Sequence, residues 1–171
     1  ENKWIGGGSS RPDATKGPKG LMKFDGADWT VYNTDNSGLP SNCILCLAVD
    51  GAGNKWIGTD RGLVKFNGTD WTVYAPVGYR LTAAPDGSVW GLEMSRGTWN
   101  LFRVSGDHWT VIDLEGSGLP SWGIESLCVD REGGLWFGTS GGLAWLAKVN
   151  LDEVKRKPAS SVGYVFALES V

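Results

Sequence analysis

The sequence predicts an all-β protein built from internal repeats, and three observations lead to this class. Residues 20–32, GLMKFDGADWTVY, recur as residues 62–74, GLVKFNGTDWTVY, with ten of the thirteen positions identical. The 171 residues include 26 Gly and ten Trp, which is typical of short strands joined by tight turns with aromatic layers between sheets. Asp-Gly or Asn-Gly pairs separate several strand-like segments, as in hairpins. Together these features indicate a repeat architecture.

The first two copies of the repeat can be followed strand by strand. The segment NKWIG opens the first copy and returns in the second, and hairpin turns are expected at Asp25-Gly26 and Asn67-Gly68. A Gly-, Pro- and Ser-rich insertion separates the first two strands of the first copy. The strands expected in these two copies cover residues 2–6, 20–24, 28–32, 43–49, 54–59, 62–66 and 70–74.

The third and fourth copies are looser but keep the same order. YRLTAAPDGSVWGL supplies two strands around Asp86-Gly87, and NLFRVSGDHWTVI supplies two more. GIESLCVDREGGLWFGT and GLAWL open the fourth copy, beyond which LDEVKRKPAS predicts a weak edge strand or a short helical turn. No α-helix longer than about two turns is expected in this pattern.

Four antiparallel strands in a unit of about 40–45 residues are the signature of a β-propeller blade. We therefore predict a single β-propeller domain over residues 1–171 with four blades, each a four-stranded antiparallel sheet. The predicted blades are residues 163–171 plus 1–33, residues 42–75, residues 79–113 and residues 123–157.

The two ends of the chain match as parts of one blade. Ala48 and Cys128 stand eight positions before a repeat Trp, and when Val171 is joined to Glu1, Ala167 stands eight positions before Trp4. Residues 163–170 are therefore expected to be the innermost strand of the first blade, in the same chain or in a neighbouring copy. The residues expected to act in ring closure or assembly are Tyr164, Phe166, Leu168, Trp4 and Ile5.

Two sets of Trp residues are predicted to be equivalent between blades. The first set is expected to be mostly buried on the second strands, and the second set to lie on the outer strands. The first set is Trp4, Trp56, Trp90 and Trp136, and the second is Trp29, Trp71 and Trp109.

A known family shares these motifs. The segments NKWIGTDRGLVKFNGTDWTVYN and SGLPSNCILCLAVD resemble the two-component regulator propeller repeat, with W-I-G-T, G-L, F, G-L-P-S and a strand ending in Asp in that order. The resemblance covers residues 2–146. It implies a propeller of the kind found in extracytoplasmic sensor regions of bacterial regulators, hence an extracellular or periplasmic interaction or ligand-sensing module. The alternative is a structural protein that self-assembles by donating its terminal strand, and a further alternative is a propeller lyase.

Charge and hydropathy exclude several classes of function. The net charge is −3, from 16 basic and 19 acidic residues, which argues against nucleic acid as a main partner. No apolar run approaches the roughly 18 residues of a membrane-spanning helix. The chain begins at Glu1 without a signal-peptide pattern, so we expect a processed product or part of a longer protein. A protein partner or self-association is expected, and the sequence names no small ligand.

No catalytic residue, cofactor or metal site is predicted, and we expect a non-enzymatic protein. The single histidine, His108, stands where other copies have Asp28 and Asp70, so a repeat role is expected for it. Streptogramin lyases resemble this fold but need a His-based site with a metal. Asp50, Asp86 and Asp130 precede Gly-containing turns in different blades, and we read them as turn residues rather than as calcium ligands.

The cysteines do not form a recognisable reactive site. Cys43 and Cys46 have C-x-x-C spacing inside an expected strand, where positions three apart point to opposite faces, so we expect buried, inert thiols. With Cys128 the count is odd, which leaves at least one thiol free within a chain.

Two segments are candidate binding sites. The insertion over residues 6–20 is unique to the first copy, and loops that carry charged side chains are common binding elements. In the G-L-P-S loop of the fourth copy, a Trp replaces the Asn42 of the second copy, and it could stack on a sugar or a partner chain. The candidate binding residues are Arg11, Asp13, Lys16, Lys19 and Trp122.

Overall fold

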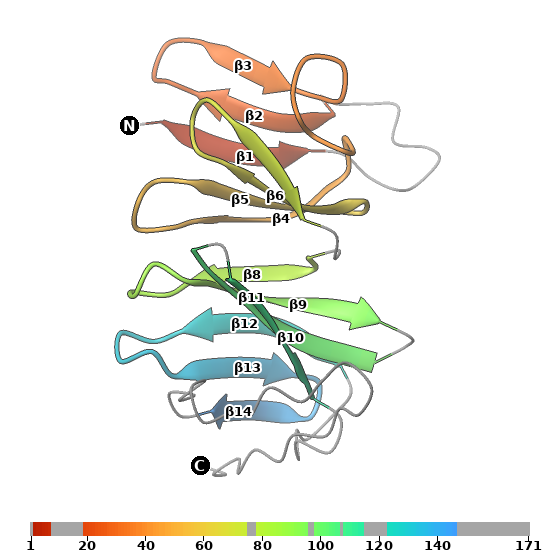
Figure 1. The fold of residues 1–171 in the computed structure, drawn as a ribbon, viewed down its shortest axis with the longest axis vertical. Coiled ribbons are helices and arrows are strands. Elements are labelled where there is room, and N and C mark those ends of the chain that lie inside the picture. Colours follow the sequence, from red (N-terminus) through yellow and green to blue (C-terminus); the bar gives the residue numbers. More distant parts are fainter. Residues whose placement is uncertain are drawn as a thin grey trace. The chain divides into compact units, whose positions relative to one another are not determined.

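The computed structural model describes residues 2–7, 19–74, 78–95, 98–106, 108–114 and 123–146. Throughout these ranges the regular structure is β, with fourteen strands in four antiparallel sheets and no helix (Figure 1). The all-β class is confirmed. The chain divides into two compact units, residues 1–81 and 82–171.

Within each sheet the strands follow one another in chain order and pair as hairpins (Figure 1). The first sheet is β1 (Lys3–Gly7), β2 (Gly20–Phe24) and β3 (Trp29–Tyr32). The second is β4 (Ile44–Val49), β5 (Lys55–Thr59), β6 (Gly62–Phe66) and β7 (Trp71–Tyr74). The third is β8 (Arg80–Ala83), β9 (Val89–Ser95), β10 (Thr98–Ser105) and β11 (His108–Asp113). The fourth is β12 (Ile124–Val129), β13 (Leu135–Thr139) and β14 (Gly142–Leu146).

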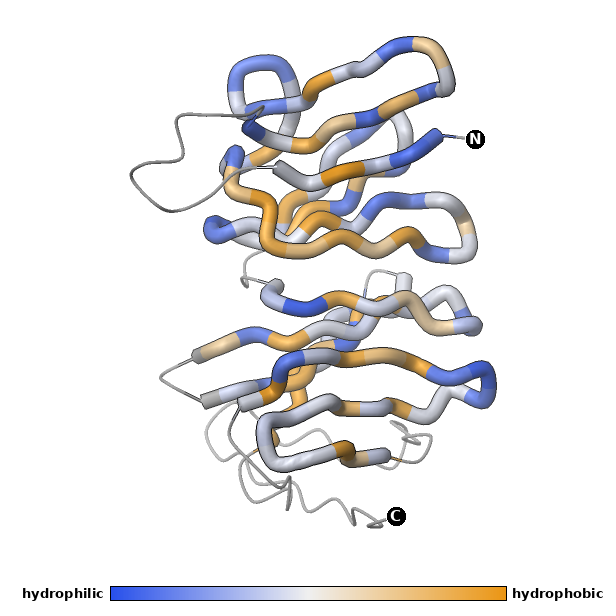
Figure 2. The backbone as a smooth tube through the Cα atoms, turned by 180° about the vertical axis from the view of Figure 1, so that it is seen from behind, coloured by the Kyte–Doolittle hydropathy of each residue, from blue (hydrophilic) through white to orange (hydrophobic). Residues whose placement is uncertain are grey.

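The hairpin turns form where the Asp-Gly and Asn-Gly pairs predict them. Asp25 and Asn67 each accept hydrogen bonds on the side-chain Oδ1 from the two amides that follow across the turn, and each donates its own amide to the far side of the turn. Gly26 and Gly68 have φ values of 112° and 110°, a region that favours glycine. Figure 2 shows hydrophilic turns alternating with more hydrophobic strands.

The first Trp set is equivalent in register, as predicted. Each member lies on the second strand of its repeat and pairs with a residue of the third, in the pairs Trp4–Lys23, Trp56–Lys65, Trp90–Arg103 and Trp136–Trp145. The prediction that all four are mostly buried is only partly right. Trp56 and Trp90 are buried, whereas Trp4 and Trp136 are half-buried and belong to the two sheets for which three strands are described.

The second Trp set is also equivalent. Each member stacks on a phenylalanine of the preceding strand, and the ring centroids lie 4.9 Å apart for Phe24–Trp29, 4.1 Å for Phe66–Trp71 and 4.5 Å for Phe102–Trp109. This confirms the repeat alignment on the outer strands.

In the first unit, an aromatic layer joins the first sheet to the second. Tyr32 approaches Phe66 and Trp71 with centroid distances of 5.7 and 5.6 Å, and Trp4 meets Phe66 edge-on at 5.9 Å. Fully buried Leu21 and Ile57 complete this core. One sheet's Trp–Tyr face thus covers the next sheet's Phe–Trp face, as between neighbouring blades.

The second unit has its own core between the third and fourth sheets. It contains Trp90, Leu92, Leu101, Ile112, Ile124, Leu135, Phe137 and Leu146, each exposed by 5% or less. This packing places the β8–β9 turn near the β12–β13 turn, which matters for the site below.

Candidate functional site

Three turns between the first and second strands of a repeat have one backbone design. The residue six positions before the repeat Trp is Asp50, Ala84 or Asp130, and its amide donates to the carbonyl four residues later at 3.1, 2.8 and 2.9 Å. A glycine three residues on, with φ between 80° and 90°, donates back to the same residue's carbonyl. Only glycine adopts that conformation without strain, so the sequence determines the turn locally.

In the second sheet's turn, the Asp50 carboxylate ties the turn to the repeat Trp. Oδ1 accepts from the amides of Ala52 and Asn54 at 3.0 and 2.9 Å, and Oδ2 accepts from the Asn54 side chain at 2.8 Å and from Trp56 Nε1 at 2.9 Å. Burial raises the pKa of Asp50, but the hydrogen bonds from Trp56, Asn54 and Ala52 outweigh it and hold the pKa below its usual value.

The Asp130 carboxylate repeats this arrangement in the fourth sheet. Oδ1 accepts from the amides of Glu132 and Gly134 at 2.9 and 2.7 Å, and Oδ2 accepts from Trp136 Nε1 at 3.0 Å. The Trp136 indole and these amides lower the pKa of Asp130. Both carboxylates thus act as turn residues, as the sequence predicts.

The third sheet departs from this design. Asp86 is a turn residue, as the sequence predicts, but the residue equivalent to Asp50 and Asp130 is Ala84, whose methyl group can accept no hydrogen bond. The Asp86 carboxylate lies two positions later, where Oδ1 accepts from the Ser88 amide and hydroxyl at 2.9 and 2.6 Å and Oδ2 accepts from Arg103 Nη2 at 2.8 Å. Burial raises the pKa of Asp86, but these bonds and the Arg103 charge lower it overall.

This change leaves the Trp90 indole N–H without an acceptor in the described part of the chain. Trp90 is 5% exposed, and the Arg103 guanidinium lies 5.5 Å from its ring centroid, within reach of a cation–π contact. Arg103 Nε is buried without a hydrogen-bond partner, whereas Trp90 Nε1 keeps contact with solvent. Two donors of the third sheet that have no acceptor in the described part of the chain therefore lie at one place, one of them buried and one accessible.

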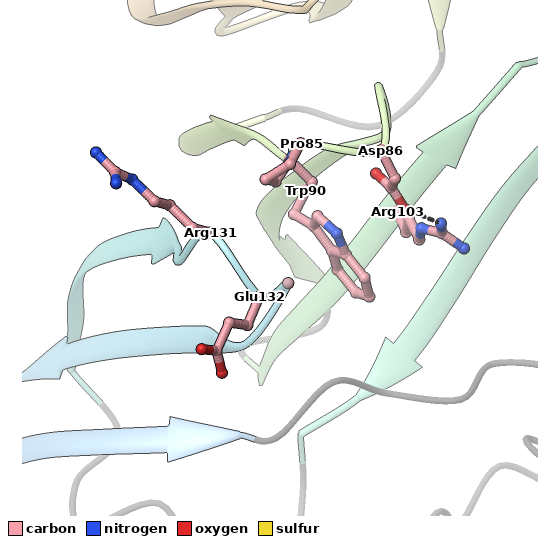
Figure 3. A pocket seen from close by; sticks show the side chains of 8 residues that line it. Pro85, Asp86, Trp90, Arg103, Arg131 and Glu132 are labelled. Carbon is pink, nitrogen blue, oxygen red and sulfur yellow. Dashed lines mark hydrogen bonds and ion pairs between the residues drawn. The ribbon is translucent and has the colours of Figure 1, made fainter.

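A cavity of about 170 Å³ opens at this place between the third and fourth sheets. In Figure 3, Trp90 stands in the middle, with Asp86 and Arg103 on one side and Arg131 and Glu132 on the other. The Arg131 guanidinium points away from Trp90, so this residue lies at the rim. The lining residues are Ala84, Pro85, Asp86, Trp90, Arg103, Arg131, Glu132 and Gly133.

Of the residues that the sequence proposed for binding or closure, the structure describes three, and none of these lines the cavity. Lys19 is exposed just before β2, Ile5 is 45% exposed on β1, and Trp4 lies under the Lys55 ammonium at 5.1 Å. Arg11, Asp13, Lys16, Trp122, Tyr164, Phe166 and Leu168 lie outside the described residues. The Trp90 cavity was missed, although aligning the three turns position by position would have revealed Ala84 as the exception.

The cysteines and His108 supply no chemistry to the cavity. Cys43 and Cys46 are half-buried rather than fully buried, and a register shift between Ile44 and Cys46 breaks the strict alternation assumed from the sequence. Burial raises the pKa of Cys46 to about 12, and its thiol donates to the Gly78 carbonyl. His108 is exposed at the start of β11. Across the described ranges, no group of three His, Cys, Asp or Glu residues could hold a metal ion.

Comparison with known proteins agrees with the repeat reading. A family model described as "Two component regulator propeller" matches residues 38–61 and 118–141, which contain the Asp50 and Asp130 turns. These two segments are two-component regulator propeller repeats. The Ala84 turn lies outside both matches. No match was found among curated proteins.

Solved structures show the same fold at low identity. An extracellular domain from B. thetaiotaomicron, classed with a hybrid two component system, is 20% identical with a TM-score of 0.62, covering 85% of this chain and 20% of that one. A second such domain from B. thetaiotaomicron is 20% identical with a TM-score of 0.58, covering 75% and 18%. An inactive variant of virginiamycin B lyase from Staphylococcus aureus, solved with quinupristin, is 17% identical with a TM-score of 0.58, covering 88% and 61%. The chain thus spans about a fifth of the first two domains.

In the described residues, no helix is long and apolar enough to cross a membrane.

Proposed function

We propose that this chain is a non-enzymatic binding segment of an extracytoplasmic β-propeller, acting in ligand sensing or protein interaction. The observation that carries this proposal is the presence of two regulator propeller repeats in a fold shared with extracellular domains of two component systems. Each sheet is taken as one blade, and the cavity between the third and fourth sheets is the binding site that the described residues favour.

The roles of the carboxylates favour binding over catalysis. Asp50 and Asp130 are engaged by their own turns, and Asp86 is engaged by Ser88 and Arg103, so none is positioned as a free general base. His108 stands at a repeat position and is not among the residues that line the cavity. The alternative that the chain is a lyase is supported by similarity of fold to virginiamycin B lyase, and a shared fold does not by itself imply a shared function.

The experiment that tests the proposal combines binding and turnover. Thermal shift with a panel of neutral and anionic small molecules should reveal ligands that raise the melting temperature, because a ligand bound to the folded state stabilises it. The same ligands, and quinupristin, should be recovered unchanged after incubation, as judged by mass spectrometry. Conversion of quinupristin that disappears in His108→Asn would overturn the non-enzymatic proposal.

Self-assembly is a second candidate function because one aromatic face of the first sheet is exposed in the described part of the chain. Phe66 and Trp71 are covered by Trp4 and Tyr32, but the equivalent stack of Phe24 and Trp29 leaves Trp29 55% exposed. A further blade with a Trp–Tyr face, from a second copy of the chain, would cover it.

Multi-angle light scattering tests this second candidate. If copies associate through this face, Trp29→Glu should convert a concentration-dependent oligomer into a monomer. Val73→Glu, at a 52% exposed valine of β7, is the matched control and should leave association unchanged. A chain that is monomeric at all concentrations would remove this candidate.

The terminal strand belongs to the same proposal. Residues 163–170 are proposed as the innermost strand of the first blade, paired with β1, in the same chain or a neighbouring one. In the described part of the chain, β1 pairs with β2 on one side only, which leaves an edge of the kind that accepts a strand. Removal of residues 163–171 should destabilise the chain, and a peptide of these residues should bind the truncated chain. If truncation leaves stability unchanged and the peptide does not bind, the pairing is refuted.

A further inference from the structure

The three equivalent turns allow the residue six positions before the repeat Trp to be compared within one chain. In two of them a carboxylate accepts the repeat Trp indole N–H, from Asp50 to Trp56 and from Asp130 to Trp136. In the third, the methyl group of Ala84 stands at that position, and it lines a cavity together with Trp90. The backbone hydrogen bonds of the turn are otherwise the same.

We propose that this cavity binds the carboxylate group of a small ligand, which takes the place filled by Asp50 and Asp130 in the other two turns. The inference rests on the proposed binding function and names the chemical class that the site would recognise.

The donors of the cavity fit this group. Trp90 as a residue is more than nine-tenths buried, whereas its Nε1 keeps contact with solvent and has no acceptor in the described part of the chain, so a ligand oxygen can reach this donor. The Asp86 amide stands at the position of the Ala52 amide, which donates to Asp50 Oδ1. These two donors stand at the positions of two donors to Asp50, whereas the Ser88 amide, at the position of the Asn54 amide, already donates to Asp86 Oδ1.

The charged side chains around the cavity balance one another. Arg103 and Arg131 supply two positive charges, and Asp86 and Glu132 supply two negative ones. Because Arg103 is paired with Asp86 and the Arg131 guanidinium points away from Trp90 (Figure 3), the preference for a carboxylate rests on the N–H donors, which bind a charged oxygen more strongly than a neutral one. The volume of about 170 Å³ suits a small carboxylate or the acidic end of a longer ligand.

Acetate is the probe that tests this inference, with acetamide as its neutral counterpart. The Trp90 indole resonance is assigned in ¹H–¹⁵N spectra by its loss in Trp90→Phe, which keeps an aromatic ring in the core. Acetate should move this resonance downfield in a saturable manner, and the apparent affinity for acetamide should be at least tenfold weaker.

Two charge-matched variants locate the binding. Ala84→Asp places the chain's own carboxylate in the cavity, so the Trp90 resonance should already lie downfield and its response to acetate should be lost. Ala52→Asp adds the same charge at an exposed turn residue and should respond like the wild type. If Ala84→Asp does not fold, the acetate titration of the wild type and its comparison with acetamide still show whether the cavity binds a carboxylate.

The outcomes separate this inference from the proposed function. An unmoved Trp90 resonance, equal responses to acetate and acetamide, or an undiminished response in Ala84→Asp would each overturn the carboxylate site. A neutral ligand that raises the melting temperature in the panel above would then still support a binding module. A chain that binds neither kind of molecule would contradict both.

Discussion

Replacing Asp50 with Ala removes the one acceptor that joins the β4–β5 turn to the core of the second sheet. The carboxylate receives four hydrogen bonds, of which the one from Trp56 Nε1, at 2.9 Å, is the most deeply buried. Trp56 is 3% exposed, so water cannot readily replace the lost acceptor.

The expected loss follows from how buried each donor is. An indole N–H left unpaired in the core costs about 1–3 kcal/mol, and the lost bonds to half-buried Asn54 add about 1 kcal/mol, whereas the exposed Ala52 amide regains water. The unfolding free energy should therefore fall by about 2–4 kcal/mol. Asp50→Asn keeps an oxygen acceptor without the charge and should lose less.

Urea unfolding followed by tryptophan fluorescence measures this loss, provided that the slope with denaturant is unchanged. Asp60→Ala, at an exposed turn residue of the same sheet, is the matched control and should change stability by less than about 0.5 kcal/mol. A loss below about 1 kcal/mol for Asp50→Ala, or one no larger than that of the control, would show that the carboxylate does not hold the turn to the core.

Three further predictions follow from the same residues. The pKa values of Asp50 and Asp130 lie below the ordinary 3.8, so the stability that these carboxylates contribute should be complete above about pH 4 and be lost as the pH falls through the lowered pKa values. Urea unfolding between pH 7 and 2.5 should show this loss, and the free energy of unfolding should fall less steeply with pH in Asp50→Asn. Ala84→Asp should stabilise the fold by about 1 kcal/mol by giving Trp90 an acceptor, and an unchanged or lower melting temperature would contradict this. His108→Asn should leave stability within about 0.5 kcal/mol, as judged by calorimetry, because the side chain is exposed and Asp stands there in two other repeats.

The features that the sequence predicted correctly depend on neighbours along the chain. Turn positions follow from Asp25-Gly26 and Asn67-Gly68, where glycine permits the positive φ that each turn requires. The Trp register follows from repeat spacing, because Trp56 and Trp136 each stand eight residues after their partners on the preceding strand, Ala48 and Cys128. Such local relations survive even at the low identity between the copies.

The features that the sequence missed depend on contacts between sheets. The extent of Trp4 burial depends on what covers the first sheet, and a bulge near Cys46 cannot be read from alternation alone. The cavity beside Trp90 needs residues from two sheets, since Arg131 and Glu132 come from a turn that lies 41 and 42 residues after Trp90 in the sequence. The sequence motif of a turn shows whether the turn contains the Asp, but it does not show that a cavity forms where a copy of the repeat has another residue at that position.

The Ala84 turn shows that the backbone does not need the carboxylate. Its two hydrogen bonds, at 2.8 and 3.0 Å, and the φ of 81° at Gly87 match those of the Asp50 turn. The carboxylate therefore contributes by pairing the repeat Trp rather than by forming the turn. Since the turn forms without the carboxylate, this position can vary in one sheet without loss of fold, and the proposed ligand group would then take the place that Asp50 and Asp130 fill in the two other turns.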